Sequence, residues 1–320
     1  MNPHPIPGRL NLAIAAVQLA ALLGLLWSAG QVSSWWGLAL VALGYGVVMN
    51  SAYAMLHEAE HNILHSDPRW NELTGVVLAL FFPAPFHLLR QGHLGHHLRN
   101  RSDDEAFDFY FEGDNRLWRF LQLYGTLTGC FWLVIALSNL LAAVHPRLLE
   151  LEAARRDRPT AALIDSLNPR YWRLIQLEAL AVLVLHTTLI IVFGVPVWAY
   201  AVVLAGFGVM WSAMQYVHHF GTERDVQKGA LNLRTFRLLD LLWLNHNWHL
   251  NHHLSPTVPW LYLPLVSGPD SPPRGQLLLA YLRMWRGPRL THVRVQNRHA
   301  GKIIRRSEEH TSELQSLTNL

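Results

Sequence analysis

Two long stretches of the chain contain no charged side chain, and they constrain the fold more than any other feature. No Asp, Glu, Lys or Arg occurs from Leu10 to His57 or from Ala179 to Thr222, so each stretch exceeds 40 residues. A helix needs about 20 apolar residues to cross a bilayer, so each stretch is long enough for two passes. The sequence therefore predicts an integral membrane protein. It also excludes intrinsic disorder, which needs low hydrophobicity and high charge.

Each stretch is interrupted near its middle, by SAGQVSS in the first and by GVP in the second. Neither interruption contains Lys or Arg, whereas the other polar segments are rich in arginine. The positive-inside rule therefore places both termini and those segments in the cytoplasm. Tryptophans flank both interruptions, as in the aromatic belt at a membrane surface. We expect two helical hairpins, whose spanning helices cover 10–29, 35–55, 171–193 and 197–217.

Two further apolar segments, 73–89 and 117–144, do not have the pattern of simple spans. The first contains Pro83 and Pro85 and separates two histidine clusters, which a single crossing would place on opposite sides of the membrane. The second is too short for two crossings. We therefore expect re-entrant or interfacial helices here, with six spans as the alternative. The predicted fold is all-α, with four transmembrane helices in two hairpins and a cytoplasmic cap that carries the histidine clusters.

The remaining composition limits the cofactors and the source. Cys130 is the single cysteine, which excludes a disulfide framework, a cysteine-ligated zinc site and an in-chain iron–sulfur cluster. The basic side chains are 24 Arg and 2 Lys, which suggests a GC-rich bacterial genome and hence a bacterial inner membrane. We expect one membrane domain over 1–305. Residues 306–320 match the translation of a common short-read sequencing adapter, so we interpret them as a disordered artefact without function.

Short clusters hold most of the 19 histidines, and their spacing repeats. HEAEH places His57 and His61 four residues apart. HLGHH and HLNHH each place three histidines at positions i, i+3 and i+4, which share one face of a helix. A further pair, His218 and His219, directly follows the fourth predicted span. The histidines that we expect to bind metal are His57, His61, His93, His96, His97, His218, His249, His252 and His253.

This pattern indicates a metal centre with imidazole ligands. Each cluster offers two or three rings to one point, and eight or nine nitrogen ligands are too many for one ion and suit two. Imidazole binds iron, copper and zinc, but zinc sites normally close at four ligands, so two irons fit best. Nearby acids can accept the second N–H of a ligating ring. The acids that could do so are Glu58, Glu60, Asp103, Asp104, Glu105 and Asp108, and further candidates for a supporting role are His219, Asn245 and His246.

The boxes HEAEH, HLGHH and HLNHH, separated by two hydrophobic hairpins, resemble those of the integral-membrane fatty acid desaturase superfamily. The last box with its flanks, NWHLNHHLSP, is especially similar to the pattern of that family. The resemblance covers about residues 10–265. It implies a non-haem di-iron centre that uses O2 against an unactivated C–H bond. It also implies an external electron donor of the ferredoxin, rubredoxin or cytochrome type.

Carried over by position, the resemblance assigns the eight box histidines as iron ligands. Many members add one histidine from the helix end before the last box. His218 fits this role best, because the following HFG resembles the local family pattern, and His219 is the alternative. Some desaturases hold a water on the metal with an asparagine four residues before this histidine. That position is Met214 here, with Gln215 beside it, so this contact does not carry over.

Within the superfamily, we expect desaturation of a fatty acyl or lipid chain. The alternatives are lipid or alkane hydroxylation, decarboxylation to a terminal alkene, and carotenoid ketolation or hydroxylation. A remote alternative is a zinc metalloprotease, in which HEAEH supplies two ligands and Glu58 the general base. It leaves the other two boxes unexplained. A metal transporter or sensor would need polar groups within the spans, where few occur. Nothing in the sequence indicates a nucleic-acid partner.

Two features outside the boxes have both a structural and a functional interpretation. His186 lies within the third predicted span, where an ionisable group is a functional candidate. We favour a neutral ring that is hydrogen-bonded to a neighbouring helix. The cytoplasmic side is dense in arginine, which suits an acidic electron donor or an acyl head group. Anchoring to anionic lipid headgroups accounts for most of these arginines.

Overall fold

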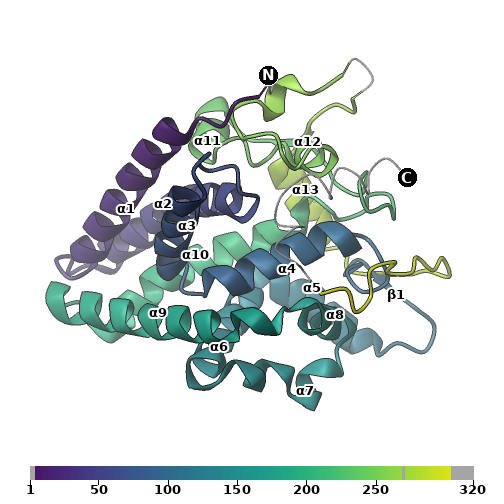
Figure 1. Ribbon diagram of the computed structural model, residues 1–320, viewed down its shortest axis with the longest axis horizontal. Helices are drawn as coiled ribbons and strands as arrows, with labels where there is room; N and C mark the ends of the chain where they lie inside the picture. Colours follow the sequence, from purple (N-terminus) through teal and green to yellow (C-terminus); the bar gives the residue numbers. More distant parts are fainter. Residues whose placement is uncertain (1–3, 269–270, 304–320) are drawn as a thin grey trace.

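The longest apolar helices of the computed structural model form two hairpins, as the charge pattern predicts (Figure 1). The structure describes residues 4–268 and 271–303. Within them, four helices are long and apolar enough to cross a membrane. They are α1 (Gly8–Ala29) and α2 (Trp35–Glu60) in the first hairpin, and α9 (Trp172–Phe193) and α10 (Val197–Val217) in the second. The predicted all-α membrane fold is therefore confirmed. The expected artefact at 306–320 lies outside the described residues.

The two hairpin tips lie together and carry exposed tryptophans. Trp35 and Trp36 at the start of α2 are 72% and 83% exposed. The ring centroid of Trp198, at the start of α10, lies 5.1 Å from that of Trp35. Indole rings favour the interface between lipid tails and water. The tips therefore mark one surface of the membrane.

Helices α2 and α10 pack more extensively than any other pair, because glycines let their backbones approach closely. A Cβ atom on Gly206 would lie 2.8 Å from the backbone oxygen of Ala42, and one on Gly46 would lie 3.2 Å from the backbone oxygen of Gly206. Small residues at such crossings are typical of membrane helices, where close van der Waals contact drives association. This contact fixes the end of α2 relative to the end of α10, and both ends carry histidines.

The two ambiguous segments are helix pairs with a sharp bend. α3 (Pro68–Phe81) and α4 (Phe86–Arg99) meet at 99°, and α5 (Arg116–Thr128) and α6 (Cys130–Val144) meet at 88°. Prolines 83 and 85 separate the first pair, and proline cannot continue a helix. Gly129 separates the second pair with a φ of +100°, which favours glycine. Neither segment is a straight span, and α4 carries the HLGHH box.

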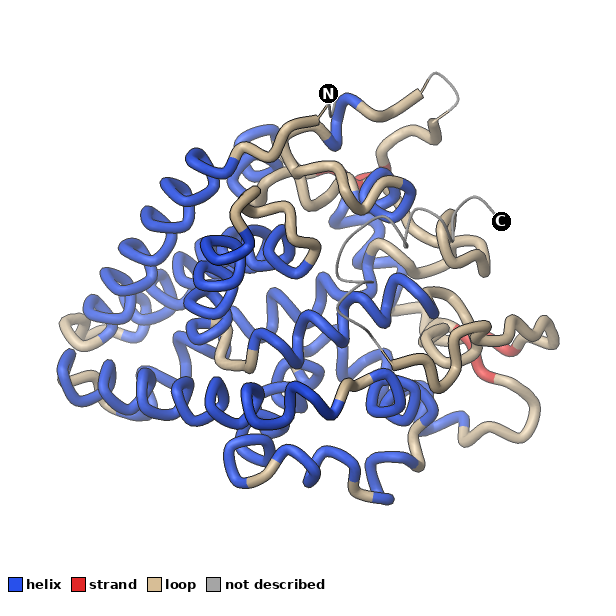
Figure 2. The backbone as a smooth tube through the Cα atoms, viewed as in Figure 1, coloured by secondary structure: helices blue, strands red, loops and turns tan. Residues whose placement is uncertain are grey.

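Short elements complete the fold around the ends of the long helices. Figure 2 shows that helices dominate and that the strands are few and short. Strands β1 and β4 pair in parallel, as do β2 and β3. The short helices are α7 (Glu152–Arg155), α8 (Arg158–Ser166), α11 (Arg237–Leu242), α12 (His249–Leu254) and α13 (Leu277–Met284), with 3-10 turns at Pro146–Glu150, Pro169–Tyr171 and Leu263–Leu265. The strands are β1 (Phe109–Tyr110), β2 (Leu233–Arg234), β3 (Gly275–Gln276) and β4 (Arg289–Leu290).

Helix α2 is longer than the sequence predicts. It continues past position 55 to Glu60, and its residues from Met49 to Glu60 are all buried. The prediction stopped early because the histidine and acidic residues of the last turns interrupt the apolar sequence. In the structure these residues are surrounded by protein rather than by lipid. The first histidine box therefore lies on the last turns of a spanning helix.

His186 has the structural role that we favoured. Its Nδ1 lies 2.6 Å from the hydroxyl oxygen of Tyr200 on α10, and its Nε2 lies 2.9 Å from the backbone oxygen of Leu80 in α3. A neutral ring satisfies both contacts, because Nε2–H donates to the carbonyl and Nδ1 accepts from the hydroxyl. His186 thus links the second hairpin to the first bent pair.

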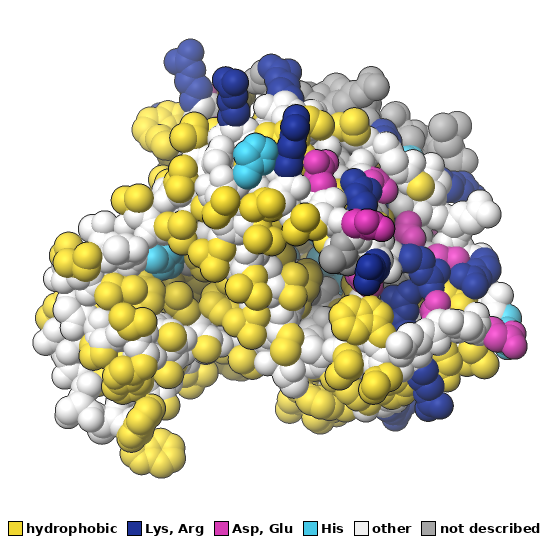
Figure 3. Space-filling model, turned by 90° about the horizontal axis from the view of Figure 1, so that it is seen from below, with side chains coloured by type: hydrophobic (Ala, Val, Ile, Leu, Met, Phe, Trp, Pro, Cys, Tyr) yellow, Lys and Arg dark blue, Asp and Glu magenta, His cyan; other side chains and the backbone are white. Residues whose placement is uncertain are grey.

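Charged side chains are distributed unevenly over the surface. Figure 3 shows a face whose left end, toward the hairpin tips, carries hydrophobic side chains and no charged ones. Lysine, arginine and acidic side chains gather on the right and along the upper edge of the same view. This division matches a molecule with one end in lipid and the other in water.

Candidate metal centre

Histidines that are far apart along the chain converge in two groups. Within each group the candidate ligand atoms all lie within 4.8 Å of one another. We call His57, His61, His93, His97 and His252 group A, and His96, His219, His249 and His253 group B. All nine side chains are buried except those of His93 and His96, which are half-buried. The structure therefore brings all eight box histidines together, and the ninth member is His219.

Four elements deliver these rings to one end of the helix bundle. The end of α2 supplies His57 and His61, and α4 supplies the second box. His219 follows the end of α10, and α12 carries the third box. The turn before α12 has positive φ angles at Leu244 and Asn245, +48° and +53°. Such conformations are rare for residues other than glycine and are often found close to functional sites.

Each HxxHH box is divided between the two groups. In the second box His93 and His97 join group A, whereas His96 joins group B. In the third box the outer pair joins group B and His252 joins group A. The expectation that all three rings of a box point to one place is therefore too coarse. Residues i+3 and i+4 of a helix lie about 100° apart around its axis, on either side of residue i, so their rings can reach different centres.

The ring nitrogens face one another as metal ligands do. In group A the Nε2 atoms lie 2.7 Å apart for His61 and His93, 3.1 Å for His93 and His97, and 2.9 Å for His97 and His252. The Nε2 of His57 is buried and has no hydrogen-bond partner in the part of the chain that the structure describes. A neutral imidazole has one N–H and one lone pair, so several converging Nε2 atoms cannot all satisfy one another. A cation among them would accept their lone pairs, so the residues fit a metal.

Group B has the same convergence and stronger outer support. The Nε2 of His249 lies 3.1 Å from that of His219 and 3.2 Å from that of His253. The Nδ1 of His96 lies 2.7 Å from Oε2 of Glu105, and the Nδ1 of His219 lies 2.7 Å from the backbone oxygen of Gly229. These contacts place N–H on Nδ1 and leave Nε2 as the ligand atom.

Six acids were expected to support the histidines. Of these, Glu105 contacts a histidine ring, that of His96 in group B. Oε2 of Glu58 accepts a hydrogen bond from the backbone N–H of Trp260. Asp104 accepts from Asn297. Asp103 pairs with Arg224, and Asp108 pairs with Arg101. Oε2 of Glu60 is buried without a hydrogen-bond partner among the described residues.

His218, which the sequence favoured as the ninth ligand, lies beside group B and is not among its members. Its Nε2 lies 3.2 Å from Oδ1 of Asn247, and its ring centroid lies 4.7 Å from that of His249. Asn247 donates in turn to Asp240. Sequence reasoning missed Asn247, although it lies two residues before the last box. The side chain of Asn245 donates to the backbone oxygen of Trp260.

Burial keeps these rings neutral. Loss of solvent lowers the pKa of His249, His252 and His253 well below the ordinary value, and neighbouring rings lower it further. Burial lowers the pKa of His246 to about 4. For His218 burial is again the main cause, and the pKa falls to about 3. Only a neutral imidazole can bind a metal, so the fold presents the rings in the form that metal binding requires.

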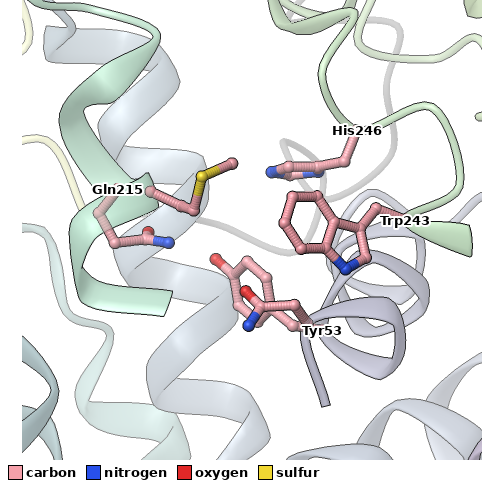
Figure 4. Close-up of a pocket in the computed structure, with 6 residues that line it drawn as sticks. Tyr53, Gln215, Trp243 and His246 are labelled. Carbon is pink, nitrogen blue, oxygen red and sulfur yellow. The ribbon is translucent and has the colours of Figure 1, made fainter. Parts of the chain in front are cut away.

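A small hollow lies next to both groups. Asn50 and Tyr53 of α2, Met214 and Gln215 of α10, and Trp243 and His246 line it. Figure 4 shows Trp243 and His246 on one side of this hollow and Gln215 on the other. The ring centroid of His246 lies 4.9 Å from that of His57 in group A and 5.5 Å from that of His249 in group B. The hollow is therefore adjacent to both groups.

Comparison with known protein families gives a match. The family model described as fatty acid desaturase matches residues 33–288, which is most of the chain and includes both histidine groups. No curated protein matches the chain.

Proposed function

The chain belongs to the fatty acid desaturase family, and from this premise we propose that it is a membrane di-iron oxidoreductase that uses O2 to desaturate a fatty acyl or lipid chain. The observation that carries the proposal is the convergence of nine imidazoles in two groups at one end of the apolar hairpins. Oxidoreductase activity follows from the family. The metal, its number, O2 and the reaction are the proposed parts.

The ligand chemistry supports iron. Both groups offer nitrogen ligands without sulfur, and Glu105 supports one ring with a carboxylate. Imidazole suits iron, and two groups of four and five rings suit two ions. When bound, a di-iron pair would supply the oxidising power for attack on an unactivated C–H bond. His57, His61, His93, His97 and His252 would hold one ion, and His96, His219, His249 and His253 the other.

The chain itself orients the ligands and excludes water. Glu105 and the backbone oxygen of Gly229 fix two rings of group B through their Nδ1 atoms. Burial of most rings removes competing water, which strengthens every polar contact in the site. The hollow beside His246 lies next to both groups, and in this structure it has room for little more than one water molecule.

The single cysteine of the sequence cannot ligate an iron–sulfur cluster. We propose an external donor of the ferredoxin, rubredoxin or cytochrome type. It would dock on the cytoplasmic side of a bacterial inner membrane, the side where the positive-inside rule places the histidine groups. His93 in group A and His96 in group B are both half-buried, so each group has one partly accessible ring.

A zinc metalloprotease fits the geometry poorly. It would need Glu58 to activate a water on the metal that His57 and His61 bind. Instead Oε2 of Glu58 accepts a hydrogen bond from Trp260, at 3.0 Å. Three further histidines join His57 and His61 in group A, where a catalytic zinc needs an open position.

The test is expression in a lipid-producing bacterial host, followed by mass spectrometry of fatty acids, alkenes and carotenoids. We expect an acyl chain that is lighter by two hydrogens, and iron bound to the purified protein. His61→Ala is the matched inactive control. A hydroxylated chain, a terminal alkene or an oxidised carotenoid would move the assignment to a sibling reaction. Bound zinc without iron, and no oxidised product in any lipid class, would overturn the proposal.

A further inference from the structure

His87 belongs to neither histidine group, yet carboxylates contact both nitrogens of its ring. Its Nε2 lies 2.6 Å from Oε1 of Glu72 on α3, and its Nδ1 lies 2.6 Å from Oε1 of Glu178 on α9. An ionised carboxylate only accepts hydrogen bonds, and a neutral imidazole has a single N–H. The ring therefore donates to both partners only as an imidazolium, with a proton on each nitrogen.

The start of α4 favours the ionised form of Glu178. Pro85 occupies the N-cap position of this helix and has no side-chain oxygen to accept from the first turn. Oε2 of Glu178 takes this role and accepts from the backbone N–H of His87 at 3.1 Å. The positive end of the helix dipole stabilises a negative charge at this place. Glu178 thus binds the backbone and the ring of one residue and holds the start of α4 against α9.

One turn further along α4, Arg90 extends the network to the first histidine box. Its Nη1 lies 3.1 Å from Oε2 of Glu72, so this carboxylate contacts both basic side chains of the helix. Its Nε donates to the backbone oxygen of Glu60 at 3.1 Å, and its Nη2 donates to Oδ1 of Asn62. Glu60 and Asn62 are the chain neighbours of His61.

The network reaches group A where two of its rings face each other. Arg90 lies three residues before His93, and side chains at this spacing share one face of a helix. The Nε2 atoms of His61 and His93 lie 2.7 Å apart. The contacts of Arg90 with the neighbours of His61 therefore fix α4 relative to the end of α2, and with it the distance between these two rings.

The network is electrically balanced only when His87 is protonated. Two basic side chains then face two carboxylates. Loss of the proton would leave an excess negative charge beside the buried Glu178, which is costly. Glu72, whose side chain is 40% exposed, is the end that water reaches. Tyr171 also packs against the ring, with centroids 5.0 Å apart, and a tyrosine adds no charge at neutral pH.

The surroundings of His87 oppose those of the ligand rings. Burial alone would lower the pKa of His87, but hydrogen bonds to Glu178 and Glu72 and the charges of both carboxylates outweigh it and raise the pKa to about 9. Burial lowers the pKa of His93 and His97 on the same helix well below the ordinary value. The stabilisation by the charged ring is fully present below the ordinary histidine pKa and is lost as the pH rises through about 9.

We propose that His87 and Arg90 are positioning residues of group A, which hold α4 against α9 and the end of α2 so that His61 and His93 meet at one metal ion. This inference rests on the proposed function, because it takes group A as a metal site. Group A would thus have its outer support at the level of whole helices, whereas group B has it at single rings.

Cobalt binding to the metal-free protein tests the proposal without turnover. Equilibrium dialysis gives the affinity of each binding step, and His219→Ala, which lacks a ring of group B, identifies the step of group A. We expect His87→Gln to weaken that step by about 10-fold or more at neutral pH and to leave the other unchanged. His186→Gln is the matched control, because it removes another buried ring that links helices, and it should change neither step.

A second substitution separates the charge of His87 from its shape. His87→Gln leaves one carboxylate in excess, and Glu72→Gln in the same chain restores the balance. The double variant should recover most of the affinity of the group A step, because the new amide oxygen still accepts from Arg90. A loss of packing alone would not be recovered in this way.

The wild-type chain provides a test that does not depend on the folding of any variant. Metal affinity normally rises with pH as ligands lose protons, but the ligand rings are already neutral at pH 7. We expect the group A step to weaken relative to the group B step as the pH rises through about 9. In His87→Gln the ratio of the two steps should stay constant over the same range.

Three results would overturn the inference: equal weakening of both steps in His87→Gln, weakening of neither, and a constant ratio of the two steps in the wild-type chain between about pH 8 and about pH 10. Two cobalt ions bound as expected, without an oxidised lipid from the expressing host, would contradict the proposed function alone. Oxidised lipid from His87→Gln, with both ions bound at wild-type affinity, would contradict this inference alone.

Discussion

Groups A and B are built from the same side chain but are held in different ways. Group A has five rings, and the Nδ1 atoms of His61 and His252 are buried without a hydrogen-bond partner among the described residues. Group B has four rings, of which His96 is held by a carboxylate and His219 by a backbone carbonyl, whereas the Nδ1 of His249 is also buried without a hydrogen-bond partner among the described residues. Group A thus depends on the number of its ligands, and group B on their outer partners.

The difference predicts that the two groups bind metal unequally. A hydrogen bond to a carboxylate raises the basicity of a ligating imidazole and fixes its orientation. Group B would therefore bind metal through fewer rings, two of which are held by outer partners. A site with fewer ligands also leaves more positions for O2. The following predictions test this comparison, from the largest expected effect to the smallest.

Loss of one ring should harm group B more than group A. His219→Ala leaves three rings in group B, whereas His57→Ala leaves four in group A. We expect His219→Ala to retain about one iron per chain and no activity, because a vacant ligand position lowers affinity directly. His57→Ala should retain most of its iron. Elemental analysis of the purified variants measures this, and His218→Ala is the control that should keep both ions. More iron lost from His218→Ala than from His219→Ala would reverse the assignment of the ninth ligand.

Removal of the carboxylate support should weaken group B alone. Glu105→Gln removes the charge next to His96 and should lower iron affinity of this group by about 10- to 100-fold. Competition with a chelator measures the effect as one weakly held ion out of two. Asp104→Asn is the matched control, because Asp104 contacts Asn297 and no ring. Equal effects of both variants would show that Glu105 acts through general charge.

Asp240 should support both groups equally, because its partners hold the segment that leads to α12. Burial alone would raise the pKa of Asp240, but hydrogen bonds from Asn247, Arg274 and Thr235 outweigh it and lower the pKa. Its stabilisation is therefore fully present above the ordinary carboxyl pKa and is lost as the pH falls through the lowered value. Asp240→Asn should cost about 2 kcal/mol at neutral pH. The free energy of unfolding of Asp240→Asn should also fall less steeply with decreasing pH than that of the wild-type chain.

Thermal unfolding in detergent between pH 3 and pH 7, followed by tryptophan fluorescence, measures this contribution. The wild-type chain should lose stability relative to Asp240→Asn at the acid end of this range. An unchanged difference between the two chains across the range would show that the Asp240 carboxylate does not titrate with folding.

The smallest effect is expected at Glu58, which group A does not use. Glu58→Gln keeps an acceptor for the backbone N–H of Trp260, so it should cost about 0.5–1.5 kcal/mol of stability and leave iron content unchanged. Iron analysis and thermal unfolding of the same preparation separate the two effects. Loss of activity at full iron occupancy would instead revive the role of general base for this residue.

Much of the fold was predictable because membrane insertion leaves a clear record in the sequence. The spans predicted at 10–29 and 197–217 match α1 and α10 closely, since lipid excludes charge over the whole length of a helix. The end of α2 was predicted too early, at position 55. Its last turns are buried by protein, which tolerates His57 and Glu58 where lipid would not.

The candidate site was predictable as a set of residues but not as an arrangement. Helical spacing predicts that the box histidines lie close together, and they do so in the structure. Helical spacing alone could not predict that His96 and His97 belong to different groups, because that assignment depends on where the neighbouring helices lie. The choice between His218 and His219 depends on the rotation of one turn after α10. The support by Glu105 depends on a loop whose path no local pattern specifies.

The divided boxes link the two histidine groups covalently. His96 and His97 are adjacent in the chain, as are His252 and His253, and their ring centroids lie 5.7 Å and 5.8 Å apart. Two peptide bonds, one on α4 and one on α12, therefore set the separation of the groups by covalent geometry. Sliding or tilting of the long helices as the bilayer thins and thickens would carry both groups along as a unit. The distance between the two groups would then remain constant while the surrounding membrane changes.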